Sequence, residues 1–304
     1  MTSLQFGPLC LPPESEQVVD ADEEIFLLYT DLQSGNQTSE AGTTFRGLGH
    51  IDSHKDVLTV TFELNGLSAP SVSPTKSKRD SRRTRKSEKE TRVVSKPMEF
   101  EVLIAQDKTA LRSRKGDTGS VLWHASVDFA KLILRQVHFP DPAIHMLVDR
   151  ANLKECHILE LGYTVTDIDD LVPLIQKNAQ LNNLSSFDSN LVVSSLDWIA
   201  LQQTSPSKRQ QAFAFDPIDL LLVVDCIYHP FLLPPLLETL DFLATPGTTT
   251  VMVVVELRAA DVAREFLQLW IGKPDWEVWR IADDGRFLGR PYVMWAGRKR
   301  AALS

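Results

Sequence analysis

Through the second half of the chain, short runs of hydrophobic residues alternate with longer runs in which hydrophobic and polar residues are mixed. Short apolar runs such as 219–228 and 248–258 have the character of parallel strands that are covered on both faces. Amphipathic runs separate them, as at 169–182, where Leu171 and Ile175 recur at helical spacing. Strands that alternate with helices predict an α/β domain with a mostly parallel sheet and helices on both faces. The expected strands are 157–162, 163–168, 190–198, 219–228, 248–258, 276–283 and 291–299, the expected helices are 169–182, 231–245 and 259–273, and 204–211 is expected to be a loop.

The first half of the chain is less regular. Residues 1–23 are rich in proline and acidic residues and predict a loosely ordered arm. The runs 24–32 and 56–64 are rich in β-branched and aromatic residues and predict strands, and the second of them alternates with a period of two. A further strand is expected at 98–106, followed by a helix within 118–139.

A polar and basic stretch at 67–97 interrupts these elements. Between Pro70 and Thr91 it has almost no large apolar residues, so it cannot bury enough surface to offset its ordering entropy, and we expect a disordered linker. The basic run from Lys76 to Arg92 allows two interpretations. One is a solvated insertion, which we favour, and the other is a patch for nuclear import or for contact with the ribosome or RNA. The expected division is an arm with strands at 1–66, the linker at 67–97 and the main domain at 98–304.

Composition narrows the classes of protein that fit. The chain has 304 residues, a net charge of −8 and a pI near 5.4, whereas nucleic-acid-binding domains usually carry a basic footprint. Direct nucleic-acid binding is therefore expected at most from the basic linker. Three widely spaced cysteines without a CxxC pair fit free thiols in a reducing compartment, and no metal site is expected. No secretory signal or apolar span is evident, so we expect a cytoplasmic protein, with the nucleus as the alternative, and a monomer.

Chemically active side chains follow several of the expected strands. In open parallel sheets, ligands sit outside the carboxyl ends of the strands. Asp167 follows the second expected strand and Asp225 the fourth. A charge at the end of an apolar strand needs a reason, and we favour function for both, with a helix N-cap as the alternative for Asp167. His229 is expected to begin the next helix, and Arg258 is expected to make a structural ion pair.

The order of these pieces resembles the lysine-methyltransferase branch of the seven-strand class I methyltransferases. The matching pieces are GSVLW (119–123), HILELG (157–162), VTDID (165–169), LDW (196–198), DCIYHP (225–230) and VELR (255–258). No single piece is specific, and the weight lies in the ordered set with a D-x-x-Y element after the fourth strand. The resemblance covers residues 98–300 and extends to fungal enzymes that methylate a lysine of a large-subunit ribosomal protein. It implies a Rossmann-like sheet and a protein-lysine N-methyltransferase that uses S-adenosyl-L-methionine.

The resemblance also implies a role for each matching residue. Trp123 is expected beside the methionine end of S-adenosylmethionine, and Glu160 and Gly162 belong to the strand-one motif that begins the cofactor site. Asp167 is expected to accept hydrogen bonds from the ribose hydroxyls. The remaining positions are Asp197 and Trp198 near the adenine, Val224 in the same pocket, and Asp225 and Tyr228 facing the acceptor lysine. For Trp123 and Trp198, a role as core anchors fits equally well.

The chemistry of methyl transfer agrees with these roles. Transfer from a sulfonium is an in-line displacement that needs a neutral amine, whereas a free lysine has a pKa near 10.4. An apolar channel with aromatic walls lowers the pKa of lysine by desolvation, and a carboxylate such as Asp225 can orient the nitrogen. No nucleophilic side chain is required.

One part of the class I pattern is missing. These enzymes place a glycine-rich E-x-G-x-G turn and a helix between the first two strands, because the backbone must approach the cofactor closely. Here ELG at 160–162 runs directly into YTVTD. Parallel neighbours need a crossover of about a dozen residues, so the first strand–loop–helix unit is truncated between Gly162 and Tyr163. We expect weak or no binding of S-adenosylmethionine and reduced stability.

Two explanations for the truncation stay open. The segment was lost through a misassigned intron or a splice variant, which we favour, or the chain is a true pseudoenzyme. The alternative function is accordingly a catalytically inactive interaction protein on the methyltransferase fold. A dinucleotide oxidoreductase is less favoured, because it too needs a glycine-rich G-x-G-x-x-G turn.

Overall fold

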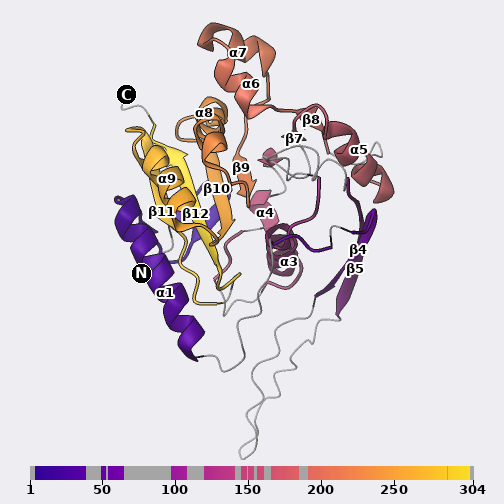
Figure 1. Ribbon diagram of the computed structural model, residues 1–304, viewed down its shortest axis with the longest axis horizontal. Coiled ribbons are helices and arrows are strands. Elements are labelled where there is room, and N and C mark those ends of the chain that lie inside the picture. Colours follow the sequence, from indigo (N-terminus) through magenta and orange to yellow (C-terminus); the bar gives the residue numbers. More distant parts are fainter. Residues whose placement is uncertain are drawn as a thin grey trace, which may run out of the picture.

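Figure 1 shows the computed structural model of the chain. It describes residues 4–38, 49–52, 54–64, 97–107, 120–140, 145–148, 150–153, 156–160, 166–184, 191–285 and 287–301. Of the linker expected at 67–97, only Pro97 is described. Gly162 and the junction at 161–165 also lie outside the described residues.

A six-stranded sheet in the order β3-β11-β12-β10-β9-β6 forms the centre of the molecule (Figure 1). β6, β9 and β10 pair in parallel, whereas β12 is antiparallel to β10 and β11, and β3 is antiparallel to β11. The sheet is therefore mixed rather than mostly parallel. β11 and β12 are consecutive strands, and antiparallel neighbours need no crossover helix. The strands are β3 Glu16–Gln17, β6 Ile158–Glu160, β9 Leu220–Val224, β10 Thr250–Glu256, β11 Trp276–Arg280 and β12 Tyr292–Lys299.

Helices cover both faces of this sheet, as expected for a Rossmann-like α/β fold. Alternate residues of β10 point to opposite sides, which gives two hydrophobic clusters. Val251, Val253 and Val255 pack in the cluster that includes residues of α1, α8 and α9, whereas Met252 and Val254 pack in the cluster that includes α3. The helices are α1 Ala21–Thr38, α3 His124–His138, α8 Leu233–Leu243 and α9 Ala260–Ile271.

The N-terminal segment differs from the prediction. Instead of a loose arm, it forms a hairpin of β1 (Leu4–Phe6) and β2 (Leu9–Leu11) and then β3, which joins the central sheet. The strand expected at 24–32 is wrong, because this run lies inside α1. Asp20 Oδ1 accepts hydrogen bonds from the backbone N–H groups of two residues in the first turn of the helix, at 2.8 and 3.0 Å, and three acidic residues there suit the helix dipole.

The strands expected at 56–64 and 98–106 are confirmed. β4 (Val57–Leu64) and β5 (Met98–Ala105) pair as an antiparallel hairpin. The other edge of β5 is bound by two asparagines of α5 (Val172–Leu181 with Asn182 as its C-cap). The amide of Asn178 accepts from Ala105 N at 2.7 Å, and the amide of Asn182 accepts from Leu103 N at 2.8 Å. These side chains satisfy backbone groups that a third strand would otherwise pair.

The second and third strands of the expected sheet are short and stand apart from the central one. β7 (Thr166–Asp167) and β8 (Ser194–Ser195) pair in parallel as a separate two-stranded sheet. Only five residues, 161–165, connect β6 to β7, which leaves no room for a crossover helix. The predicted truncation of the first strand–loop–helix unit therefore coincides with a pair of strands detached from the sheet.

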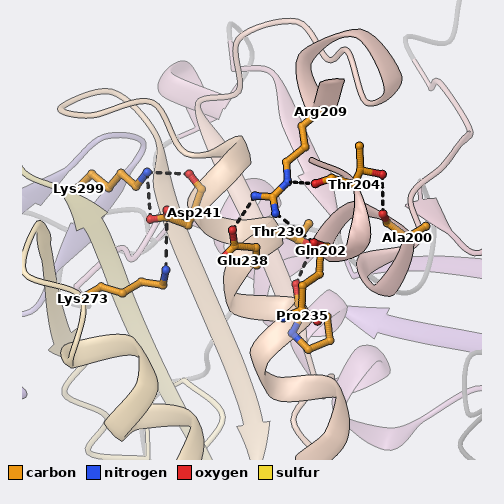
Figure 2. Close-up of polar contacts among 10 residues, drawn as sticks. All are labelled: Ala200, Gln202, Thr204, Arg209, Pro235, Glu238, Thr239, Asp241, Lys273 and Lys299. Carbon is orange, nitrogen blue, oxygen red and sulfur yellow. Dashed lines mark hydrogen bonds and ion pairs between the residues drawn. The ribbon is translucent and has the colours of Figure 1, made fainter. Parts of the chain in front are cut away.

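The loop expected at 204–211 is helical instead. α6 (Trp198–Gln203) is followed by α7 (Pro206–Ala212), in which the proline occupies the first turn, where its missing N–H costs nothing. Arg209 fixes the two helices, as Figure 2 shows. Its Nη1 lies 2.6 Å from Glu238 Oε1 of α8, and its Nε donates to Thr204 O at 2.9 Å. Two short elements complete the described fold, namely α4 (Arg150–Leu153) and η1 (Pro230–Leu232).

No helix within the described residues is long and apolar enough to cross a membrane. The same part of the chain holds no group of three or more histidine, cysteine, aspartate or glutamate side chains suited to a metal ion.

Candidate functional site

The carboxyl ends of β9 and β10 bring together two acidic side chains and one arginine. Asp225 follows β9, and Glu256 and Arg258 stand at the end of β10. Arg258 Nη2 lies 2.6 Å from Asp225 Oδ2 and 2.7 Å from Glu256 Oε2. We call these three residues and Trp123 the strand-end cluster. The ion pair expected for Arg258 is confirmed.

Asp225 is held in an unusual state. Its side chain is 2 % exposed, and its φ of 58° lies in the left-handed region, which a non-glycine residue adopts only at a cost. Its backbone N–H donates to Val254 O at 2.7 Å. Burial raises the pKa of Asp225, while the guanidinium of Arg258 acts in the opposite direction. A buried charge in a strained backbone position is typical of functional sites.

Trp123 and the segment at 49–51 close over Arg258. The guanidinium carbon lies 5.2 Å from the centroid of the Trp123 ring, a cation–π distance. Gly49 has a φ of +91°, and a Cβ at that position would lie 2.3 Å from Arg258 Nη2. The backbone of His50 forms a bridge with Trp123, and Gly49 O accepts from His124 N at 2.9 Å. Only a glycine lets this segment approach the arginine so closely.

The other predicted acids converge near Cys226. Burial raises the pKa of the Cys226 thiol well above its ordinary value, and the charges of Glu160, Asp225 and Asp167 act in the same direction. Three of the predicted site residues are thus close enough to one thiol to influence it. β6 and β9 pair in parallel, so the carboxyl ends of these two strands, with Glu160 and Asp225, lie at the same edge of the sheet.

The ends of β6 and β7, where the methyl donor S-adenosylmethionine is expected, lack part of the class I pattern. Glu160 ends β6, and its carbonyl accepts a hydrogen bond from Thr166 Oγ1 at 2.6 Å, which ties the start of β7 directly to the end of β6. Asp167 Oδ1 accepts from the backbone N–H of Ile168 at 2.8 Å. The connection between Glu160 and Thr166 contains a single glycine, Gly162. These residues do not fit S-adenosylmethionine as a whole: carboxylates are present for a ribose, but the glycine-rich turn for the methionine end is not.

Three further predicted positions have structural partners. Asp197 is the N-cap of α6, and its carboxylate accepts from Ile199 N at 2.8 Å and Ala200 N at 3.0 Å. Trp198 is half-buried and packs against the hydrophobic cluster on the α8 face of the sheet. Val224 is 1 % exposed and belongs to the cluster on the opposite face. Their proposed contacts with a cofactor stay predictions.

Tyr228 lies three residues after Asp225, half-buried, and precedes the turn into η1. His229 begins that turn, since its Nδ1 accepts from Phe231 N at 3.2 Å. This confirms the role expected for His229 and leaves the role of Tyr228 as a prediction.

Sequence reasoning missed the contributions of Gly49, His50 and Glu256. They come from segments far apart in the chain, and no local pattern marks the first two. Glu256 carried a usable signal, because it is a charge at the end of a fully apolar strand, in the same situation as Asp225.

Comparisons with known proteins agree with the class of fold. The model of a family described as lysine methyltransferase matches residues 163–270, a segment that begins at the residue after the predicted break. It contains the carboxyl ends of β9 and β10, and with them Asp225, Glu256 and Arg258 of the strand-end cluster. This match and the α/β architecture support a methyltransferase of the class I type.

Two individual proteins are similar to this chain. A Schizosaccharomyces pombe protein named diaminohydroxyphosphoribosylamino-pyrimidine deaminase is 28 % identical over 186 residues, which are 55 % of this chain and 41 % of that protein. The chain thus spans less than half the length of this relative. A solved structure described as a putative O-methyltransferase from Klebsiella pneumoniae shares 13 % identity at a TM-score of 0.34, covering 64 % of this chain and 94 % of that one. So low a score supports no conclusion about activity.

Proposed function

We propose that the chain descends from an S-adenosylmethionine-dependent protein-lysine N-methyltransferase, with its acceptor side intact and its donor side truncated. The observation that carries this proposal is the strand-end cluster, whose three charged residues, Asp225, Glu256 and Arg258, lie within the family match. In this cluster, the carboxylates of Asp225 and Glu256 and the ring of Trp123 surround the guanidinium of Arg258. Carboxylates and aromatic rings are also the groups that bind an ammonium ion.

The residues of the cluster suit a lysine acceptor. Asp225 would accept a hydrogen bond from the lysine nitrogen and orient it, and the face of Trp123 would attract it while it is charged. Partial burial favours the neutral amine, because desolvation lowers the pKa of lysine. S-adenosylmethionine, where bound, supplies the methyl group. For the chain as it stands, we expect weak or no binding of that cofactor.

The substrate and the cellular setting are proposed from the family resemblance and from the charge of the chain. A ribosomal protein of the large subunit is proposed by analogy with the fungal enzymes that the sequence resembles. The net charge of −8 would favour the approach of such a basic protein. We propose a monomer in the cytoplasm, with the nucleus as the alternative.

The second candidate function is a catalytically inactive protein that binds its partner through the same scaffold. The five-residue connection between β6 and β7 favours it. Transcript sequence across codons 160–165 separates the two functions, because an in-frame exon that encodes a glycine-rich turn would favour the enzyme.

Deaminase activity, which the name of the yeast relative suggests, has no basis in this chain. Zinc-dependent deaminases of nucleobases carry a P-C-x-x-C element and an H-x-E element. The three cysteines stand at 10, 156 and 226, so no such pair exists.

The test of the proposed function compares this chain with a repaired one. A strand–turn–helix insert containing a glycine-rich turn, placed between Gly162 and Tyr163, is expected to restore cofactor binding and methylation of basic proteins. Mass spectrometry of ribosomal proteins incubated with each chain measures the methyl groups added. A repaired chain that binds the cofactor and methylates only nucleic acids or small molecules would contradict the lysine assignment.

A further inference from the structure

The guanidinium of Arg258 occupies the centre of the strand-end cluster. Its Nη2 donates hydrogen bonds to Asp225 Oδ2 at 2.6 Å and to Glu256 Oε2 at 2.7 Å. Both of these hydrogen bonds come from one nitrogen, and the guanidinium carbon lies 5.2 Å from the centroid of the Trp123 ring. The two carboxylates therefore hold their cation through a single nitrogen and not through the planar fork that arginine usually offers to a carboxylate.

A single nitrogen is also what a lysine side chain presents. The ammonium group of lysine is a compact cation with three donors, whereas the advantage of arginine lies in paired hydrogen bonds from two nitrogens. The face of an aromatic ring attracts either cation. The contacts that hold Arg258 in this cluster are therefore contacts that a primary ammonium can reproduce.

The cluster has room for one cation at a time. A Cβ at Gly49 would lie 2.3 Å from Arg258 Nη2, so the covering segment leaves no space for a further group on that side of the nitrogen. Two cations side by side would also repel each other. An ammonium ion can therefore bind Asp225 and Glu256 only after the guanidinium has left.

The side chain of Arg258 can reach solvent. It is 30 % exposed, whereas the side chains of Asp225 and Glu256 are 2 % and 7 % exposed. Arg258 stands between the end of β10 at Glu256 and the start of α9 at Ala260, so a change of its rotamer breaks no helix or strand hydrogen bond. Exchange of one cation for another keeps the buried carboxylates paired, which avoids the cost of leaving them without a cation.

We infer that Arg258 makes an autoinhibitory contact: its guanidinium occupies the position of the acceptor lysine, and a primary ammonium binds there only in exchange for it. This inference rests on the proposed function, which supplies the lysine. Because Arg258 is part of the chain, its effective concentration at the cluster is high, so a free amine competes poorly. A lysine of a protein that makes further contacts displaces it more readily. The exchange therefore favours protein substrates over small amines.

The probe is n-butylammonium, which reproduces the end of a lysine side chain. Thermal unfolding midpoints are measured against its concentration at constant ionic strength, without S-adenosylmethionine, because a ligand that binds the folded chain raises the midpoint. Arg258→Ala vacates the site and should bind n-butylammonium at least about tenfold more tightly than the wild-type chain, in which the tethered guanidinium competes. Neutral n-butanol should not distinguish the two chains. The matched control is Arg264→Ala, whose partner Asp22 is exposed, and it should respond as the wild-type chain does.

Two further variants keep the test decisive if Arg258→Ala does not fold. Arg258→Gln retains most of the stem of the side chain without the charge and should also bind n-butylammonium more tightly than the wild-type chain. Arg258→Ala combined with Asp225→Asn leaves one buried carboxylate instead of two, so it should fold more readily than Arg258→Ala alone and yet lose the response. Circular dichroism shows whether each variant is folded.

Equal responses of the wild-type chain and the Arg258 variants to n-butylammonium would overturn the inference, because Arg258 would then not control the site. Stabilisation of Arg258→Ala by methylguanidinium alone would overturn it too, since the cluster would then accept only an arginine head group. The proposed function fails separately. Lysine methylation by the repaired chain without any response here would refute the exchange alone, whereas a response here without lysine methylation would refute the proposed function alone.

Discussion

Two parts of the same sheet edge differ sharply in how well they are built. At the ends of β9 and β10, Arg258 Nη2 lies 2.6 Å from Asp225 Oδ2 and 2.7 Å from Glu256 Oε2, and Trp123 and Gly49 cover the arginine. At the end of β6, five residues replace the turn and helix that the class I pattern requires. The charged residues of the strand-end cluster all have partners, whereas the connection from β6 to β7 is shorter than the class I pattern requires.

The difference shows which features of this architecture depend on their neighbours. Asp225 follows β9, Glu256 and Arg258 stand at the end of β10, and these two strands pair in parallel over five positions. The cofactor turn instead needs the crossover that joins two parallel strands. Its loss therefore detaches β7 and β8 from the sheet and leaves β9 to β12 in place. The following changes test this contrast.

The largest effect is expected from Arg258→Ala. It leaves two buried carboxylates, Asp225 and Glu256, side by side without their cation, and should lower the free energy of unfolding by about 2–4 kcal/mol. Urea unfolding measures this. The matched control is Arg264→Ala, whose pair with Asp22 is exposed on both sides and should contribute less than about 1 kcal/mol. Equal losses would mean that the cluster is not a stabilising unit.

The next effect concerns Gly49, whose Cβ would meet Arg258. Gly49→Ala combines strain at a φ of +91° with a contact of 2.3 Å, whereas Gly285→Ala has a φ of +87° and no neighbour within 4 Å. The first should lower the free energy of unfolding by about 2–3 kcal/mol and the second by about 1–2 kcal/mol. The difference between the two variants isolates the contact with Arg258. If they are indistinguishable, the segment at 49–51 does not cover the cluster in solution.

A third effect is the pH dependence of stability. Burial raises the pKa of Asp225 above its ordinary value of 3.8, against the opposing effect of Arg258. The folded chain then binds more protons than the unfolded one between the two pKa values, so this group loses stability as pH rises through that window. The isosteric, neutral variant Asp225→Asn should therefore gain stability relative to the wild type as the pH rises above 3.8, by at most about 1.4 kcal/mol per pH unit. Urea midpoints across this range measure it, and a relative loss would mean that the ion pair outweighs desolvation.

The smallest effect is expected at the truncated junction. Thr166→Val keeps the shape of the side chain but removes the hydrogen bond from Oγ1 to Glu160 O, and should lower the free energy of unfolding by about 1 kcal/mol. Thr239→Val is the control, because the hydroxyl of Thr239 donates to Pro235 O within α8 (Figure 2). The backbone hydrogen bonds of that helix remain when the hydroxyl is removed, so a smaller loss is expected. No loss at Thr166 would show that this bond does not define the junction.

The sequence predicted the elements whose periodicity is long and strong. The runs at 219–228 and 248–258 contain the strands β9 and β10, and 231–245 and 259–273 contain helices, because apolar composition and burial agree there. The run 24–32 was misjudged on its β-branched and aromatic residues, although Asp20 and the acids after it form a capping signal that outweighs that propensity. At 204–211, polarity suggested a loop, while Pro206 in the first turn favoured the helix that is found.

In the candidate site as well, some residues are marked by a local pattern in the sequence and others are brought in only by tertiary packing. Asp225 and Asp167 were found because a charge directly after a strand is a local signal. Gly49 and His50 approach Trp123 only through tertiary packing, so no pattern along the chain could indicate them. Asp197 shows a second role that the sequence did not indicate, because its carboxylate caps α6, and its expected place near the adenine stays a prediction.

Calorimetric titration of S-adenosylmethionine into this chain tests the central claim most directly. The chain should be folded by circular dichroism and yet give no heat consistent with micromolar affinity, because the sequence between β6 and β7 lacks the glycine-rich turn while the strand-end cluster remains. Micromolar affinity of the unmodified chain for S-adenosylmethionine would contradict the account, since the cofactor would then be held without the connection on which the comparison rests.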